Sequence, residues 1–159
     1  MALADQINSH KYLFLTYIGE PEDNVLRLVV EEAKAAEKPV TTEIGHVGAV
    51  VHPIISTEND FAYEIIFESY ISYSVTNESF TQGDEYEQYE GRTLRIYSKS
   101  HFLDYVRAAT FASEDDPGPY KHYSIICLNH IVDIASAVEP KIRIIRGAGA
   151  EAGESEWRH

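Results

Sequence analysis

The stretch HYSIICLNHIVD, from His122 to Asp133, carries the side chains of this chain best suited to nucleophilic or acid–base chemistry. A cysteine acts as a nucleophile when a histidine base lies within hydrogen-bond reach. Side chains alternate between the two faces of a regular strand, so Cys127 points away from His122 and His130. Cys127 also lies between apolar neighbours, and we therefore expect it to be a small, inert core residue. A histidine from elsewhere in the chain, such as His101, could still approach it.

The same stretch could hold a histidine–carboxylate pair. His130 and Asp133 are three positions apart, so they share a face only if the strand breaks between them. A kink at Asn129 would allow this, because asparagine tolerates turn conformations. Without a nucleophile such a pair indicates little, and a buried histidine with its hydrogen bonds satisfied is the alternative. The weak catalytic candidates are His101, His122, Cys127, His130 and Asp133.

Metal and nucleotide sites find no support in the sequence. The histidines lack H-x-x-x-H spacing, and a single cysteine cannot form a C-x-x-C ligand pair. The acids at 114–116 are consecutive and lack the alternating oxygen ligands and the glycine of a calcium loop. No G-x-G-x-x-G or G-K-[ST] motif occurs. We expect no metal and no cofactor.

An acidic, tyrosine-rich segment is the best candidate for a binding surface. The net charge is −13, and residues 39–91 contain ten acids but no lysine or arginine. Opposite charge speeds the encounter with a basic protein, and tyrosine supplies contact area at modest entropic cost. Solubility alone is the alternative explanation of the charge. The predicted binding residues are Glu64, Glu68, Tyr70, Glu85, Tyr86, Glu87 and Tyr89.

Charge and composition also bear on partners and location. Nucleic-acid phosphates and anionic membranes bind clustered lysine and arginine, so we expect neither as a partner. No signal-peptide layout and no run of about 20 apolar residues occurs. One cysteine permits no internal disulfide, which favours a reducing, cytoplasmic location. Self-association is left open.

The hydrophobic pattern predicts an α+β domain over residues 1–146, mainly antiparallel, built as a bent sheet or a sandwich. Its longest alternating run is 61–76, well above the typical strand of about 5–6 residues. We expect this strand to bend near Ser69 and to be shared between two sheet regions. Its core row is predicted to be Tyr63, Ile65, Phe67, Ile71, Tyr73 and Val75.

A second strand at 93–98 is expected to pair with this run as a long-loop hairpin. That pairing would place Arg95 across from Glu64 or Glu68 and neutralise the polar face. Ser100 should then cap one clear helix at about 101–112, which crosses between strands. The apolar stripe of this helix is predicted to be Phe102, Tyr105, Val106 and Ala109.

The remaining segments are predicted to be mainly strands, followed by a disordered tail. Residues 24–38 fit both strand and helix spacing, and we choose a strand to about Glu31 followed by a helical turn. Residues 120–135 are expected to form one or two strands and 141–145 the last strand. The tail 147–159 is rich in glycine, alanine and glutamate and is expected to be disordered.

In size, acidity and tyrosine content the chain is similar to the small cytosolic immunity proteins of bacterial toxin systems, which bind a partner and block it. The resemblance is one of composition, and it implies a non-enzymatic protein-binding or adaptor role against a basic protein. The alternative is a small enzyme or ligand-binding module with a histidine-containing pocket near residues 101–133. A deep pocket with two of the histidines and an acid would favour the alternative, and a flat acidic face would favour the binder.

Overall fold

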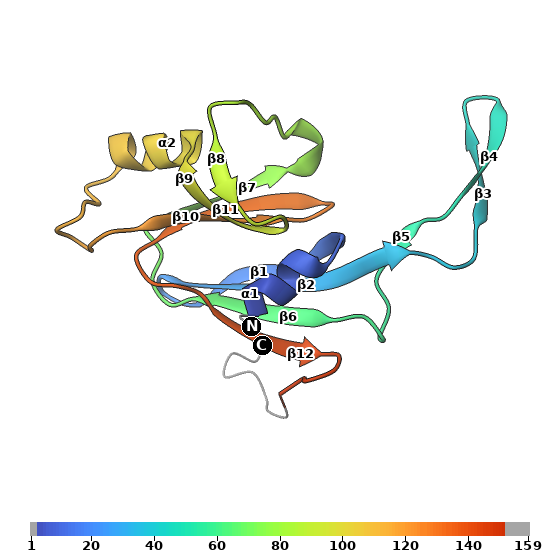
Figure 1. Ribbon diagram of the computed structural model, residues 1–159, viewed down its shortest axis with the longest axis horizontal. Coiled ribbons are helices and arrows are strands. Elements are labelled where there is room, and N and C mark those ends of the chain that lie inside the picture. Colours follow the sequence, from blue (N-terminus) through green and yellow to red (C-terminus); the bar gives the residue numbers. More distant parts are fainter. Residues whose placement is uncertain (1–2, 152–159) are drawn as a thin grey trace.

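Two antiparallel sheets make up most of the computed structural model, which describes residues 3–151 (Figure 1). The first sheet has the order β1-β2-β6-β12, with β5 beside β2: β1 Tyr12–Glu22, β2 Val25–Ala35, β5 Ile54–Ile55, β6 Ala62–Phe67 and β12 Lys141–Arg146. The second has the order β7-β11-β10-β9-β8: β7 Ser72–Asn77, β8 Gln88–Glu90, β9 Leu94–Lys99, β10 Lys121–Ile126 and β11 His130–Ser136. The predicted α+β class with mainly antiparallel strands is confirmed.

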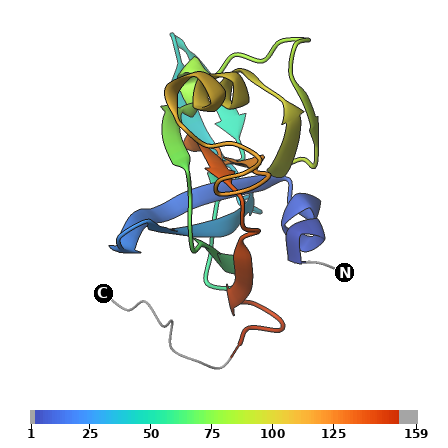
Figure 2. The same ribbon diagram turned by 90° about the vertical axis from the view of Figure 1, so that its left-hand side faces the viewer.

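Helices and a separate hairpin complete the fold. Helix α1 (Leu3–Ser9) packs near the strands β9 and β12, and α2 (His101–Ala109) lies on the outer face of the second sheet (Figures 1 and 2). A 3-10 helix, η1 (Glu78–Phe80), follows β7. Strands β3 (Val40–Ile44) and β4 (Val47–Val51) form a two-stranded sheet of their own.

The hydrophobic core lies between the two sheets. Phe67 of β6 meets Tyr123 of β10 edge to face, with ring centroids 5.4 Å apart. Such aromatic pairs stabilise a core beyond the area they bury. The first sheet and α1 contribute Ile7, Leu13, Leu26, Leu28, Val30, Tyr63, Ile65 and Phe67, and the second sheet contributes Leu94, Tyr123, Ile125, Val132 and Ile134.

The long alternating run does bend and does divide between the sheets. Its first half is β6 in one sheet, its second half is β7 in the other, and residues 68–71 connect them. Tyr63, Ile65 and Phe67 are fully buried, as predicted. Val75 is 43 % exposed, so the predicted core row is wrong there, because β7 is an edge strand of the second sheet.

The predicted hairpin between 61–76 and 93–98 is wrong. Strand β9 pairs with β8 and β10 instead, because the β10–β11 hairpin occupies the sheet between β7 and β9. Arg95 therefore does not face Glu64. Two other arginines do, Arg27 of β2 and Arg143 of β12, at 2.7 and 2.6 Å.

Two further element boundaries differ from expectation: β2 extends beyond Glu31, and α2 ends at Ala109 instead of near residue 112. No helical turn follows Glu31, because β2 continues to Ala35 with its backbone paired to β1 and then to β5. Ser100 does cap α2, and its Oγ accepts a hydrogen bond from the backbone N–H of Leu103. The buried residues of α2 are Leu103 and Val106, whereas Tyr105 is 59 % exposed, so the predicted stripe was partly wrong. Most of the predicted disordered tail, residues 152–159, lies outside the described residues.

Candidate functional site

A cleft of about 250 Å³, here called the outer cleft, lies on the face of the second sheet that carries α2. Its walls come from β7, β9, β10 and β11, from the start of α2, and from residues 80–83 at the end of η1 and directly after it. Apolar contacts come from Phe80, Phe102, Ile126 and Ile131. Polar and charged groups come from Thr76, Glu87, Arg95, Tyr97, His101, His122 and Asp133.

Strand register gives this face its polar character. Ser124 of β10 lies opposite Asp133 of β11 on one side and opposite Arg95 of β9 on the other. Directly opposed residues of antiparallel strands share a face of the sheet, so these three form one polar row. The intervening residues, such as Ile125, point into the core.

His122 is the most tightly held group at the cleft. Its Nδ1 lies 2.8 Å from Ser100 Oγ, and its Nε2 lies 2.7 Å from Asp133 Oδ1. The residue is buried, and its ring stacks on Tyr97 with centroids 4.3 Å apart. A neutral imidazole that accepts from the Ser100 hydroxyl and donates Nε2–H to the Asp133 carboxylate satisfies every group in this chain of hydrogen bonds.

The Ser100–His122–Asp133 chain has the residue types of a hydrolase triad without the access that a triad needs. Ser100 is completely buried and does not border the outer cleft. Its oxygen is already the N-cap acceptor for α2. A nucleophile must reach the substrate carbon. These hydrogen bonds therefore anchor α2 to the sheet and fix the position of Asp133 in the cleft wall.

Asp133 is the accessible end of this chain. Its side chain is 20 % exposed, in contrast to the 2 % of His122. The bond from His122 uses Oδ1 and leaves Oδ2 available to a ligand. On the same polar row, the Ser124 hydroxyl is buried and has no hydrogen-bond partner among the described residues.

His101 borders the outer cleft at the first turn of α2. Its Nε2 lies 2.7 Å from Asp84 Oδ2, and its ring stacks on Tyr86 with centroids 4.7 Å apart. The hydrogen bond that His101 donates to the Asp84 carboxylate raises the pKa of His101, and the same bond lowers the pKa of Asp84. These contacts fasten the loop before β8 to the helix.

Cys127 and His130 do not take part in the outer cleft. Cys127 is buried, and burial raises the pKa of its thiol to about 12, so the interpretation of Cys127 as a core residue is confirmed. Its backbone N–H donates to the carbonyl of His130 at the hairpin turn. The Nδ1 of His130 is buried without a partner in the described part of the chain. The structure thus joins His101, His122 and Asp133 of the five catalytic candidates.

The seven predicted binding residues do not form one surface. Glu64 is 3 % exposed beneath two arginines, so it cannot contact a partner. Glu68 and Tyr70 lie in the bend before β7. Glu68 pairs with Lys141, and Tyr70 donates a hydrogen bond to Glu20 of β1. The other four lie in or before β8, at the opposite edge of the second sheet: Glu85, Tyr86, Glu87 and Tyr89.

Sequence reasoning missed Ser100, Ser124, Arg95 and Tyr97 as neighbours of the catalytic candidates. A signal was present, because β9 and β10 each carry polar residues at alternate positions. Arg95 and Tyr97 share a face of β9, and His122 and Ser124 share a face of β10. The strand pairing that brings them together cannot be read from either strand alone.

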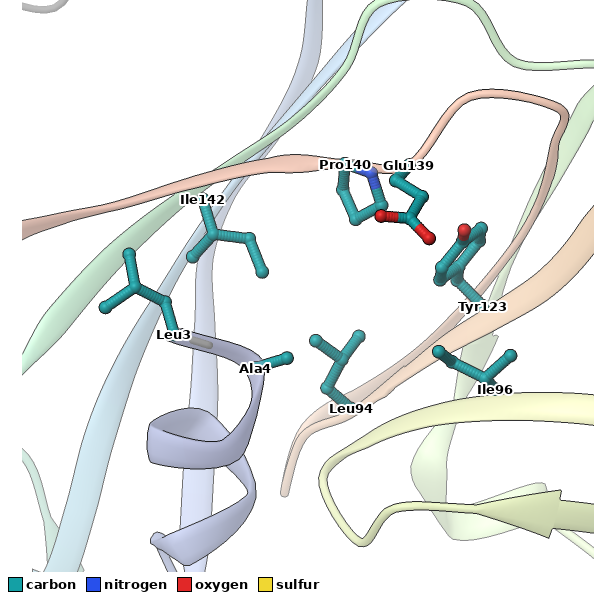
Figure 3. Close-up of a pocket in the computed structure, with 8 residues that line it drawn as sticks. All are labelled: Leu3, Ala4, Leu94, Ile96, Tyr123, Glu139, Pro140 and Ile142. Carbon is teal, nitrogen blue, oxygen red and sulfur yellow. The ribbon is translucent and has the colours of Figure 1, made fainter. Parts of the chain in front are cut away.

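A second cavity, of about 290 Å³, lies between α1 and the strands β9, β10 and β12 (Figure 3). Ala4, Leu94 and Ile142 point into it, and the carboxylate of Glu139 and the ring of Tyr123 lie at one end (Figure 3). Glu139 pairs with Lys121, at 3.4 Å. This cavity offers apolar contact area but few polar groups to select a ligand.

Across residues 3–151, no cluster of three or more His, Cys, Asp or Glu side chains is arranged to hold a metal ion. In the same part of the chain, the helices are too short or too polar to cross a membrane. Comparisons with models of protein families, with curated proteins and with solved structures find no match to this chain.

Proposed function

We propose that this protein binds a small polar molecule in the outer cleft and does not react with it. The observation that carries the proposal is that two opposite charges line the cleft on one polar row, Asp133 on β11 and Arg95 on β9. Neighbouring strands lie about 4.8 Å apart, so these backbones are separated by about 10 Å. A ligand with a cationic or donor group at one end and an acidic or acceptor group at the other would meet both.

Size limits the ligand class. Sites for drug-sized molecules occupy about 300–1,000 Å³, and the outer cleft has about 250 Å³. An amino acid or a dipeptide, which carries both an ammonium and a carboxylate, has the matching size and charge pattern. Binding without reaction is supported by the burial of Ser100, whose hydroxyl is bonded to His122.

Thermal-shift and calorimetric measurements with free amino acids and dipeptides test this proposal. Ligand binding to the folded state alone raises the unfolding temperature with ligand concentration. Asp133→Asn keeps an acceptor for His122 but removes the charge, and Arg95→Gln removes the guanidinium. Hydrogen bonds to charged groups contribute about 1.5–3 kcal/mol, so each variant should bind about tenfold more weakly or worse.

Glu58→Gln is the matched control, because Glu58 is an exposed carboxylate in the turn before β6. It should bind as the parent does. The proposal is wrong if no zwitterion stabilises the parent, or if Asp133→Asn and Arg95→Gln bind with the parent's affinity.

A second function, contact with a basic protein, is supported by residues 78–90, here called the acidic loop. Phe80 is 80 % exposed within a segment whose acids include Glu78, Asp84 and Glu85. An exposed aromatic side chain rimmed by charge is typical of a protein contact. The compositional likeness to immunity proteins implies the same class of partner.

Glu85→Lys separates this function from the first, because Glu85 does not border the outer cleft. Capture from native cells would supply a partner, and kinetic binding measurements would follow with the purified protein. The variant should slow association, and salt should weaken the parent's association rate. Equal rates for variant and parent, without salt dependence, would leave solubility as the role of these acids.

A further inference from the structure

The hairpin of β3 and β4 projects away from both sheets (Figure 1). Its strands pair with each other over five residue pairs and form a sheet separate from the rest. A two-stranded hairpin alone is marginally stable in water, and a third strand or a packed face stabilises it.

One face of this projecting hairpin is mainly apolar, with Thr42 of β3 opposite Ala49 as a polar residue on it. Val40 lies opposite Val51, and Ala49 and Val47 follow at alternate positions of β4, so all four share a face. Val47 is 71 % exposed and Val40 is 50 % exposed. Val50, on the other face, is 70 % exposed.

The edge of β4 lacks the usual protection of an open strand. Proteins guard exposed edges with lysine, proline, bulges or a covering element. The β4 sequence VGAVV has no charge and no proline, and in the described part of the chain only β3 pairs with it. Residues 39–57 contain a single charged side chain, Glu43, in a chain of net charge −13.

We propose that β4 pairs with β4 of a second copy of this chain, in antiparallel register about a two-fold axis near Ala49. The two hairpins would then form one four-stranded sheet with a continuous, mainly apolar face. A two-fold contact must be self-complementary, and an antiparallel strand edge satisfies this requirement.

The net charge of the chain and the neutral hairpin favour a second copy of this chain, and not a basic protein, as the partner of β4. Two copies of net charge −13 repel each other, and the neutral hairpin is where they approach at least cost. A basic partner would gain most at acidic surfaces and nothing from an uncharged strand. The contact is short, so we expect a weak dimer whose population rises with concentration.

Sedimentation analysis over a wide concentration range tests this proposal on the full chain. The parent should shift from monomer to dimer, and Val47→Lys and Val50→Lys should stay monomeric because they place like charges at the shared edge. Val138→Lys is the control, since Val138 is 46 % exposed outside the hairpin, after β11. It should dimerise as the parent does.

Cross-linking identifies the strand that forms the contact. Ala49→Cys introduces a thiol at the proposed two-fold axis, and the native Cys127 is buried. Mild oxidation should give disulfide-linked dimers of Ala49→Cys and few of Val138→Cys. A parent that stays monomeric, lysine variants that dimerise normally, or equal cross-linking of both cysteine variants would each overturn the proposal.

Discussion

The outer cleft and the projecting hairpin are built in opposite ways. At the cleft, Ser100, His122 and Asp133 form a continuous chain of hydrogen bonds from a helix cap to a strand. On the hairpin, valines are exposed, and charged groups are nearly absent. The cleft therefore has polar groups held in place for a small ligand, whereas the hairpin offers backbone groups and apolar area to another strand.

This difference follows from how each region is supported. The strands under the cleft lie within a five-stranded sheet and share the main core. Among the described residues, the sheet of the hairpin contains only its own two strands, β3 and β4. Fixed polar groups require a packed scaffold, because a polar side chain holds one position only when its neighbours do.

Truncating the core beneath the cleft should have the largest effect. Phe67 is fully buried against Tyr123, so Phe67→Ala should lower the free energy of unfolding by about 3–5 kcal/mol. Urea unfolding measures this loss. A decrease below about 1 kcal/mol would mean that the two sheets do not share the core described above.

Removal of the cap should have the next largest effect. Ser100→Ala deletes the N-cap of α2, which costs about 1 kcal/mol, and leaves His122 Nδ1 buried without a donor, which costs about 1–3 kcal/mol. We expect a total of about 2–4 kcal/mol in urea unfolding. Ser98→Ala, at an exposed position of β9, is the control and should change stability little.

A hairpin substitution should barely change the stability of the monomer. Val50→Thr retains β-branching at an exposed position, so we expect a change within about 0.5 kcal/mol in dilute protein. Amide hydrogen exchange should likewise be faster in 40–51 than in β10 and β11. If the dimer forms, this exchange should slow as protein concentration rises, and slow exchange in dilute protein would contradict the comparison.

The smallest effect concerns the ion pair between Asp84 and His101, which borders the outer cleft. Asp84→Asn should bring the pKa of His101 down toward about 6.5, as followed by NMR titration of the ring. Because the pKa of His101 is raised, its contribution is full below about pH 6.5 and is lost as pH rises through the folded value. Because the same bond lowers the pKa of Asp84, this contribution is present above about pH 4 and is also lost as pH falls through the folded value of Asp84.

Short-range patterns were enough to predict several features. Alternation identified the buried row of β6, and the length of that run predicted the bend into a second sheet. Ser100 was predicted as a helix cap because its side chain acts on a residue three positions away. Apolar flanks placed Cys127 in the core. Each of these depends on neighbours within a few positions in the chain.

Contacts between distant segments required the tertiary structure. The bond between His122 and Asp133 spans 11 positions and follows from the register of β10 with β11, whereas sequence reasoning considered the nearer His130. Glu64 was expected on a working surface, yet Arg27 and Arg143 approach it from neighbouring strands and bury it. Strand alternation shows which residues share a face, but only the pairing of strands, set by the packing of the whole core, decides which faces meet.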